Sequence, residues 1–133
     1  MPVTLSASSV EKLKAVHPDL VRVVKRAALM SSIDFTVMEG TRSVAQQKLN
    51  VAKGVSSTMN SRHIPGKDGL SKAVDLVPIV NGKASWDWAV YNKFAPIVKE
   101  AAKLEKVPVE WGGDWKTFKD GPHFQLPFKQ YPK

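Results

Sequence analysis

Residues 73–80, AVDLVPIV, form an apolar run that ends at an Asn-Gly pair, and this stretch constrains the fold most strongly. Valine and isoleucine favour the pleated, half-buried surface of a strand. Asn81 and Gly82 are the residues that adopt the positive φ angles of a two-residue turn. The stretch therefore predicts a strand followed by a tight turn.

Two helices are predicted before this strand. In residues 8–16, Ser8 and Glu11 have the spacing of a capping box, which indicates the start of a short helix. Residues 17–30 begin with His17, which we interpret as a structural or capping residue, and Pro18 suits the first turn of a helix. The apolar residues of this second segment recur at helical spacing. They are Leu20, Val23, Val24 and Ala27.

The rest of the chain alternates between helical and strand patterns. Strands are predicted at 33–40, 107–111 and 123–128, and helices at 43–54 and 85–107, the last broken or kinked at Pro96. In the first of these strands Ile33, Phe35 and Val37 share one face. No repeat or linker separates these elements. The order of the elements predicts an α+β fold with one domain spanning residues 1–133.

The composition limits the partners and the chemistry. The chain has 133 residues, a formal net charge of +8 and no cysteine. A metal ion must therefore be held by His, Asp or Glu, and disulfides are excluded. The positive charge favours an anionic partner such as a cell-wall polymer, but it is divided evenly between the two halves of the chain, unlike a nucleic-acid-binding arm. No signal sequence or membrane span is evident, so we expect the protein to be made and kept in a cytoplasm.

A long aperiodic segment, residues 53–72, contains His63 and ends shortly before Asp75, and both residues could bind a metal. His123 follows in a predicted strand, with Gln125 on the same face. A catalytic zinc site needs three such ligands and an open position for water, and a carboxylate beside that water acts as base and then as acid. Asp120 is placed for that role. The alternative is an ordinary surface loop with a histidine that binds nothing.

Other residues near this set have competing interpretations. Glu110 and Asp114 are rival bases, although Glu110 could be an ordinary exposed acid and Asp114 could fix the turn at residues 112–113. Trp86 and Trp88 are interpreted as core anchors rather than sugar-stacking platforms. Trp111 and Trp115 flank the turn, and one of them is expected to line the cleft while packing is the alternative.

Three motifs give the chain a family resemblance. EGTR at 39–42, SRH and AVDL within 61–76, and EWGGDW and DGPHF within 110–124 occur in the same order as in the phage L-alanyl-D-glutamate peptidases. Those enzymes belong to the zinc-dependent D-alanyl-D-alanine metallopeptidase superfamily, of the VanY and VanX type. The opening residues, HPDLVRVVKRA and DFTVMEGTR, are similar as well, so the resemblance covers nearly the whole chain.

The resemblance implies a role for each motif residue. It implies zinc ligands at His63, Asp75 and His123 and a catalytic base at Asp120. It also implies that Arg42 grips a substrate carboxylate or the developing oxyanion. Substrate contacts are implied for Ser61 and are expected for Trp115. The implied fold is a small, mainly antiparallel sheet flanked by helices, with a zinc cleft on one face.

The sequence departs from the family pattern at one place. The pattern S-x-H-x-x-G-x-A-x-D places the first two zinc ligands close together, whereas KDGLS at 67–71 is inserted here after the matching Gly66. A loop insertion costs little because closure entropy grows only logarithmically with length. We therefore expect the ligands still to meet, with this loop forming a flexible rim of the cleft.

The resemblance implies an endolysin that hydrolyses the L-Ala–D-Glu bond of the peptidoglycan stem peptide with zinc. It would act as a monomer without nucleic acid or stable membrane insertion, and a holin would release it from the host cytoplasm. One alternative is a D-Ala–D-Ala carboxypeptidase. Another is a non-catalytic wall- or nucleic-acid-binding module that keeps a structural zinc.

Overall fold

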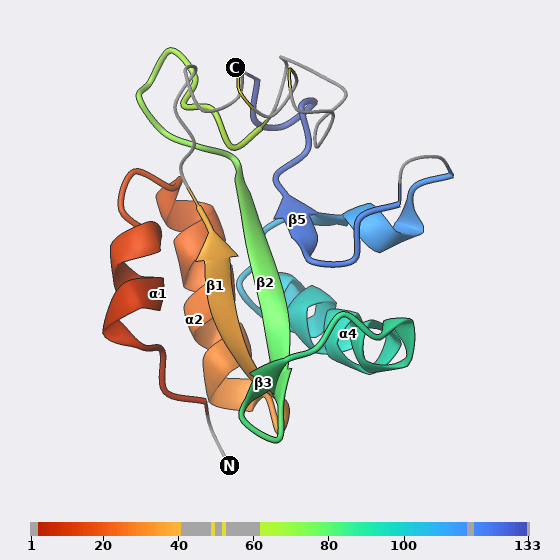
Figure 1. Cartoon of the computed structure of the whole chain (residues 1–133). Coiled ribbons are helices and arrows are strands. Elements are labelled where there is room, and N and C mark those ends of the chain that lie inside the picture. Colours follow the sequence, from red (N-terminus) through yellow and green to blue (C-terminus); the bar gives the residue numbers. More distant parts are fainter. Residues whose placement is uncertain (1–2, 41–48, 50–51, 53–61, 117–118, 133) are drawn as a thin grey trace.

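The computed structural model describes residues 3–40, 49, 52, 62–116 and 119–132. Its helices and strands follow the predicted order closely (Figure 1). The elements are α1 (Ala7–Lys12), α2 (Pro18–Met30), β1 (Asp34–Glu39), β2 (Ala73–Val80), β3 (Lys83–Ala84), α4 (Trp88–Leu104), β4 (Glu110–Trp111), the 3-10 helix η1 (Gly112–Asp114) and β5 (His123–Gln125). The predicted helix at 43–54 lies outside the described residues except for Leu49 and Ala52, which are helical.

The strands form one antiparallel sheet. The order is β1-β2-β5-β4, and β3 pairs with the end of β2. Asn81 and Gly82 join β2 to β3 with φ angles of 54° and 78°, so the predicted tight turn is confirmed. The α+β fold with a mainly antiparallel sheet flanked by helices is confirmed as well. A parallel bridge between Val16 and Ser71 lies outside the named strands.

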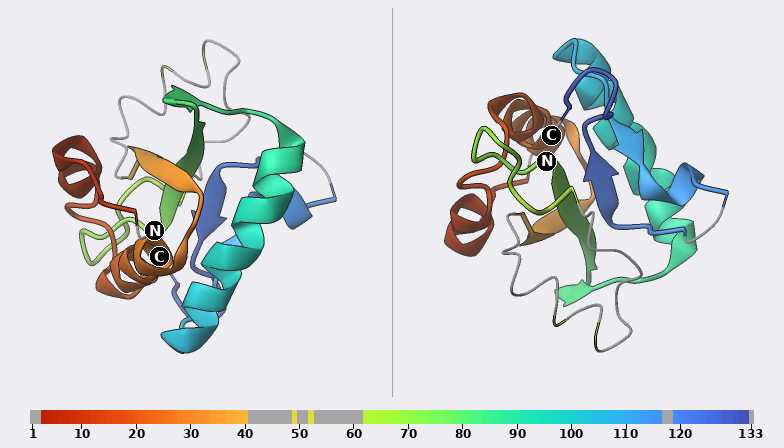
Figure 2. Two further views of the ribbon diagram at one scale, coloured as in Figure 1. Left: turned by 90° about the horizontal axis from the view of Figure 1, so that it is seen from below. Right: turned by 90° about the horizontal axis from the view of Figure 1, so that it is seen from above.

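Helices α2 and α4 pack against each other on one face of the sheet (Figures 1 and 2). The predicted apolar stripe of α2 is buried and contacts the apolar residues of β1 and β2. Phe35 and Val37 come from β1, and Phe35 packs on Phe94 of α4 with a ring separation of 5.1 Å. This side of the sheet therefore carries the main hydrophobic core.

The first helix is shorter than predicted and has a different cap. Ser6, and not Ser8, is the N-cap, because its extended backbone lets its hydroxyl accept a hydrogen bond from the Ser9 backbone N–H. The helix ends at Lys12. Ala15 has a positive φ of 63°, which a right-handed helix cannot accommodate. His17 caps α2, and its Nδ1 accepts from the Asp19 N–H at 3.1 Å, as the capping interpretation requires.

Helix α4 runs without a break through Pro96, so the predicted interruption is wrong. Proline removes one backbone donor and leaves the carbonyl four residues earlier, at Asn92, without its helical partner. Both residues lie on the exposed side of the helix, where water can satisfy that carbonyl. The helix starts at Asp87, whose carboxylate accepts from the Ala89 N–H.

The inserted loop, residues 67–71, is built from hydrogen-bonded turns. Gly69 donates to Gly66, and Gly66 donates to Leu70. Lys72 is 3% exposed, and its ammonium group donates to Asp68 at 2.5 Å. A buried ammonium group needs such partners, so the pair ties the loop down against the sheet.

Candidate metal centre

The pleat of the sheet separates the polar site from the core. Asp75 in β2 and His123 in β5 are direct partners in the antiparallel pairing. Their neighbours Val74, Leu76 and Phe124 point to the opposite face and are fully buried in the core. The strand pairing alone therefore brings two of the predicted ligands together.

The third predicted ligand, His63, comes from the loop before β2. It is 2% exposed, and its Nδ1 lies 2.8 Å from the backbone carbonyl of Gly40. Gly40 has no room for a side chain, because a Cβ atom there would lie 1.9 Å from the Lys12 carbonyl oxygen. The end of α1 thus fixes Gly40, and Gly40 fixes the ring of His63.

The three side chains converge on one point. Asp75 Oδ1 lies 3.3 Å from His63 Nε2 and 3.4 Å from His123 Nδ1, and all three ligand atoms lie within 4.8 Å of one another. Neither imidazole contact has hydrogen-bond geometry, and Asp75 Oδ1 is buried without a partner among the described residues. Two ligand atoms of a tetrahedral zinc ion are about 3.3 Å apart. The residues fit a metal ion bound between them.

The ring nitrogens that face away from this point are both occupied. His63 uses Nδ1 toward Gly40, and His123 uses Nε2 toward the side-chain oxygen of Gln125 at 2.8 Å. Both acceptors require an N–H, so each neutral ring presents its other nitrogen, without a proton, to the metal position. This arrangement is typical of metal-binding histidines.

Burial and charge act together on this site. Burial raises the pKa of Asp75, but the two imidazole rings outweigh burial and hold that pKa below its ordinary value. Burial also lowers the pKa of His123, but Asp75, together with Gln125 and Asp120, more than reverses this shift and raises the pKa. Burial, with Asp120 and Asp75 nearby, raises the pKa of Tyr91 to about 12, so this hydroxyl keeps its proton at neutral pH.

Asp120, the predicted base, lies in the turn that leads into β5. Its backbone N–H donates to Gly112 at 3.1 Å, and its carbonyl accepts from the His123 N–H at 3.3 Å. A Cβ atom on Gly112 would lie 2.4 Å from the Asp120 carbonyl oxygen, so a glycine is needed there. Its carboxylate acts electrostatically on both His123 and Tyr91.

The rival carboxylates make other contacts. Glu110 Oε1 accepts from the side-chain amide of Gln125 at 3.2 Å, on the far side of His123. Asp114 pairs with Lys99 of α4 at 2.6 Å instead of fixing the turn as we predicted. Gln125 was placed beside His123 by strand alternation, but its hydrogen bond was missed, and so was the role of Gly40. Strand alternation was the only sequence signal for Gln125, and Gly40 stood in the EGTR motif without any sign of its contact with His63.

The tryptophan residues lie in three different environments, which are the proposed site, the core and the surface. Trp115 is half-buried, and its ring centroid lies 5.1 Å from that of His123, so it lies beside the proposed site. Trp111 stacks on Phe124 in the core. Trp86 and Trp88 are 59% and 42% exposed, so their interpretation as core anchors is wrong. The predicted substrate residues Arg42 and Ser61 lie outside the described residues.

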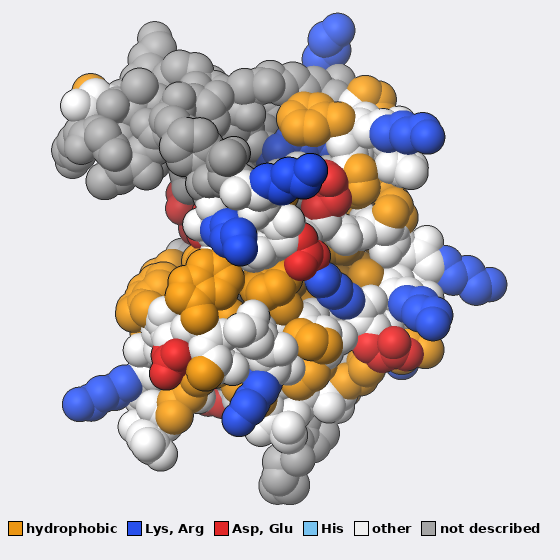
Figure 3. Space-filling model, turned by 90° about the vertical axis from the view of Figure 1, so that its right-hand side faces the viewer, with side chains coloured by type: hydrophobic (Ala, Val, Ile, Leu, Met, Phe, Trp, Pro, Cys, Tyr) orange, Lys and Arg blue, Asp and Glu red, His pale blue; other side chains and the backbone are white. Residues whose placement is uncertain are grey.

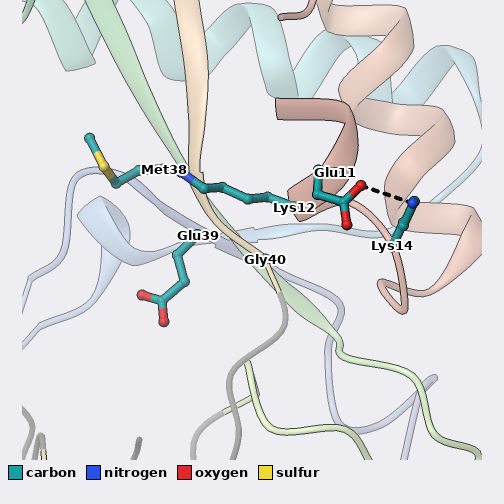
Figure 4. A pocket seen from close by; sticks show the side chains of 6 residues that line it. All are labelled: Glu11, Lys12, Lys14, Met38, Glu39 and Gly40. Atoms are coloured by element: carbon teal, nitrogen blue, oxygen red, sulfur yellow. Dashed lines mark ion pairs between the residues drawn. The ribbon is translucent and has the colours of Figure 1, made fainter. Parts of the chain in front are cut away.

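A separate hollow lies on the other side of Gly40 (Figure 4). It is lined by Glu11, Lys12, Lys14, Met38, Glu39 and Gly40. Glu11 and Lys14 pair with each other across 2.8 Å at its rim. None of the three metal-site residues lines this hollow, so it is not the metal centre.

The surface charge is dispersed. On the face that Figure 3 shows, lysine and arginine side chains are spread among hydrophobic and neutral ones. Among the described residues, no helix combines the length and the apolar character needed to cross a bilayer.

The fold and the cluster define a small α+β protein that carries the three-donor set of a catalytic metal site. The chain belongs to the family of phage L-alanyl-D-glutamate peptidases, since the sequence model of that family matches residues 1–126. The resemblance seen in the three motifs is thereby confirmed.

Individual relatives agree with this assignment. The L-alanyl-D-glutamate peptidase of Escherichia phage T5 is 35% identical over 121 residues, which cover 85% of this chain and 82% of that protein. The L-alanyl-D-glutamate peptidase of Listeria phage A118 is 38% identical over 76% of this chain, but the match spans only 33% of that longer protein. The crystal structure of the Serratia marcescens L-Ala D-Glu endopeptidase ChiX matches 97% of this chain and 93% of its own, with 47% identity and a TM-score of 0.87.

Proposed function

We propose that the protein is a zinc-dependent endolysin that hydrolyses the L-Ala–D-Glu bond in the peptidoglycan stem peptide. The observation that carries this proposal is the buried Asp75 Oδ1, which lies between two imidazole nitrogens without a hydrogen-bond partner. Relatives of similar length that are named for this peptidase activity support it. Two imidazoles and one carboxylate are donors that suit zinc.

His63, Asp75 and His123 would hold the zinc ion, which supplies a Lewis acid for the scissile carbonyl and an acidified water. Asp120 is the proposed base. Its carboxylate accepts a proton from the attacking water and then returns that proton to the leaving amine nitrogen. The position of Asp120 in the turn before His123, together with its electrostatic effect on that ring, supports this role.

Three further residues are proposed to hold the substrate. Arg42 follows Gly40 closely in the chain and is proposed to bind a peptide carboxylate or the oxyanion, as the motif implies. Ser61 is proposed as a substrate-contacting hydroxyl. Trp115 would pack on the peptide beside the metal, which its contact with His123 supports.

The biological setting is proposed on the same basis. Residues 1–133 act as one peptidase domain and as a monomer on peptidoglycan, with no nucleic acid partner and no stable membrane insertion. The protein accumulates in the host cytoplasm and reaches the wall after holin-dependent release. The dispersed positive charge suits a polyanionic wall more than a nucleic acid groove.

Mass spectrometry of fragments released from purified Gram-negative peptidoglycan tests the activity, with the zinc-loaded protein beside a His63→Ala variant. The expected products are free peptides that begin at D-Glu, with L-Ala left on the glycan, and the variant should release none. Release of D-Ala alone would identify a carboxypeptidase instead. If the zinc-loaded protein released nothing, the protein would be a wall-binding module.

A further inference from the structure

Behind His123 lies a chain of hydrogen bonds that the proposed reaction does not use. His123 Nε2 lies 2.8 Å from Gln125 Oε1, and Gln125 Nε2 donates to Glu110 Oε1 across 3.2 Å. Gln125 is 8% exposed, whereas Glu110 lies at the exposed edge of the sheet. Glu110 and Gln125 are direct partners in the β4–β5 pairing, which holds them side by side.

The chemistry of the two side chains gives this hydrogen-bond chain a direction. An ionised carboxylate can only accept hydrogen bonds, so Gln125 must turn its NH₂ group toward Glu110. Its carbonyl oxygen then faces His123 and needs a donor there. The His123 proton is therefore required on Nε2, and Nδ1 is left with its lone pair toward the metal position.

The direction of the hydrogen-bond chain matters because a second acceptor competes for the ring proton of His123. On the other side of the ring, Asp75 Oδ1 lies 3.4 Å from His123 Nδ1 and would attract a proton to that nitrogen in the metal-free protein. A ring with its proton on Nδ1 has no lone pair there for a metal ion. Something must therefore oppose Asp75 for the site to be ready for metal.

We propose that Glu110, acting through Gln125, selects the tautomer of His123 that can bind the metal ion. Both are positioning residues, and Glu110, a rival base in the sequence, acts from the far side of the ring. The proposal rests on the proposed role of His123 as a ligand.

The test compares two substitutions at the exposed end. In Glu110→Lys the new side chain can only donate, so Gln125 should turn its carbonyl toward it and its NH₂ group toward His123. Glu110→Gln removes the same charge but leaves an amide that can either accept or donate, so it should free the orientation of Gln125 without reversing it. Gln125→Met removes the relay directly, with Gln130→Met on the exposed surface as its control.

The first readout is the nitrogen-15 NMR shifts of the His123 ring in the zinc-free protein, at a pH where the ring is neutral. The second readout is the zinc affinity. We expect the proton on Nε2 in the wild type and in Gln130→Met, and a smaller shift toward Nδ1 in Glu110→Gln than in Glu110→Lys. In Glu110→Lys and Gln125→Met we expect it on Nδ1, with zinc affinity about 10- to 100-fold lower.

Wild-type ring shifts in a folded Gln125→Met variant would overturn the proposal, and so would wild-type ring shifts in a folded Glu110→Lys variant. If Glu110→Lys failed to fold, Gln125→Met would decide alone. A changed tautomer with unchanged zinc affinity would uphold the relay but contradict His123 as a ligand. That outcome would therefore count against the proposed function and not against the relay.

Discussion

Asp75 and His123 face each other across the β2–β5 pairing, with Asp75 Oδ1 3.4 Å from His123 Nδ1. Two adjacent strands of a packed sheet thus set the distance between two proposed ligands before any metal binds. Only His63 reaches the site from a loop, and the carbonyl of Gly40 holds it. A site fixed in this way loses little conformational freedom when the metal enters.

Asp75→Asn should abolish most of the stabilisation that zinc gives to the fold. Zinc at about 1,000 times its dissociation constant stabilises a protein by about 4 kcal/mol if it binds the folded state only. Thermal unfolding with and without zinc measures this effect. Asp34→Asn, at the exposed first residue of β1, is the control and should respond to zinc like the wild type. An equal response of Asp75→Asn would contradict the metal site.

Asp120→Asn should keep zinc binding and lose about 10²- to 10⁴-fold in the rate of peptide release, because an amide cannot accept the proton. Release of labelled stem peptides, together with zinc titration, measures the two properties separately. Asp114→Asn is the control, since that carboxylate pairs with Lys99 on the surface. Full activity in Asp120→Asn would assign the base to another residue.

Gly40→Ala should weaken zinc binding without touching a ligand. The added Cβ atom would lie 1.9 Å from the Lys12 carbonyl oxygen, so the end of β1 must shift and carry with it the carbonyl that holds His63. Zinc titration and thermal unfolding measure the result. Gly82→Ala is the matched control, because its positive φ of 78° makes it destabilising, but it lies in the distant β2–β3 turn. Equal zinc affinity in the two variants would contradict this role of Gly40.

Tyr131→Phe should destabilise the fold by about 1 kcal/mol, because it removes a hydrogen bond to a carboxylate. The Tyr131 hydroxyl donates to Asp19 Oδ2 across 2.7 Å and ties the C-terminal segment to α2. Tyr91→Phe is the control and should not destabilise, since the Tyr91 hydroxyl is buried without a hydrogen-bond partner among the described residues.

The pH dependence of this contact follows from the two pKa shifts. The hydrogen bond from Tyr131 lowers the pKa of Asp19 below its ordinary 3.8, so the contact contributes fully above that value and is lost as the pH falls. Burial and Asp19 raise the pKa of Tyr131 to about 12, so the contribution is also lost as the pH rises from 10 toward 12. Denaturant unfolding across this range should show the difference between wild type and Tyr131→Phe disappearing at both extremes. A constant difference would contradict the linkage.

The sequence predicted the proposed metal ligands better than it predicted the residues that hold those ligands in position. His63, Asp75 and His123 stand in recognisable motifs, and strand alternation correctly put His123 and Gln125 on one face. The hydrogen bond from Gln125 to Glu110 depends on which strand lies next to β5, and that neighbour is not encoded locally. The requirement for glycine at position 40 is not encoded locally either. It arises from contact with the end of α1 and not from the neighbours of Gly40 in the chain.

The errors in the fold also came from local rules that tertiary context overrides. Pro96 would break an isolated helix, but its exposed position lets α4 continue. Trp86 and Trp88 are large apolar residues that usually anchor a core, yet α4 buries other side chains in their place. The inserted loop has a contact that no local pattern indicated, because the buried Lys72 holds it through Asp68.

The most direct test of the metal centre is an anomalous difference map, collected at the zinc absorption edge from crystals grown with zinc. We expect one strong peak about 2.0–2.2 Å from His63 Nε2, Asp75 Oδ1 and His123 Nδ1. A peak bound by other residues, or none at this position with zinc in excess, would contradict the proposed metal centre.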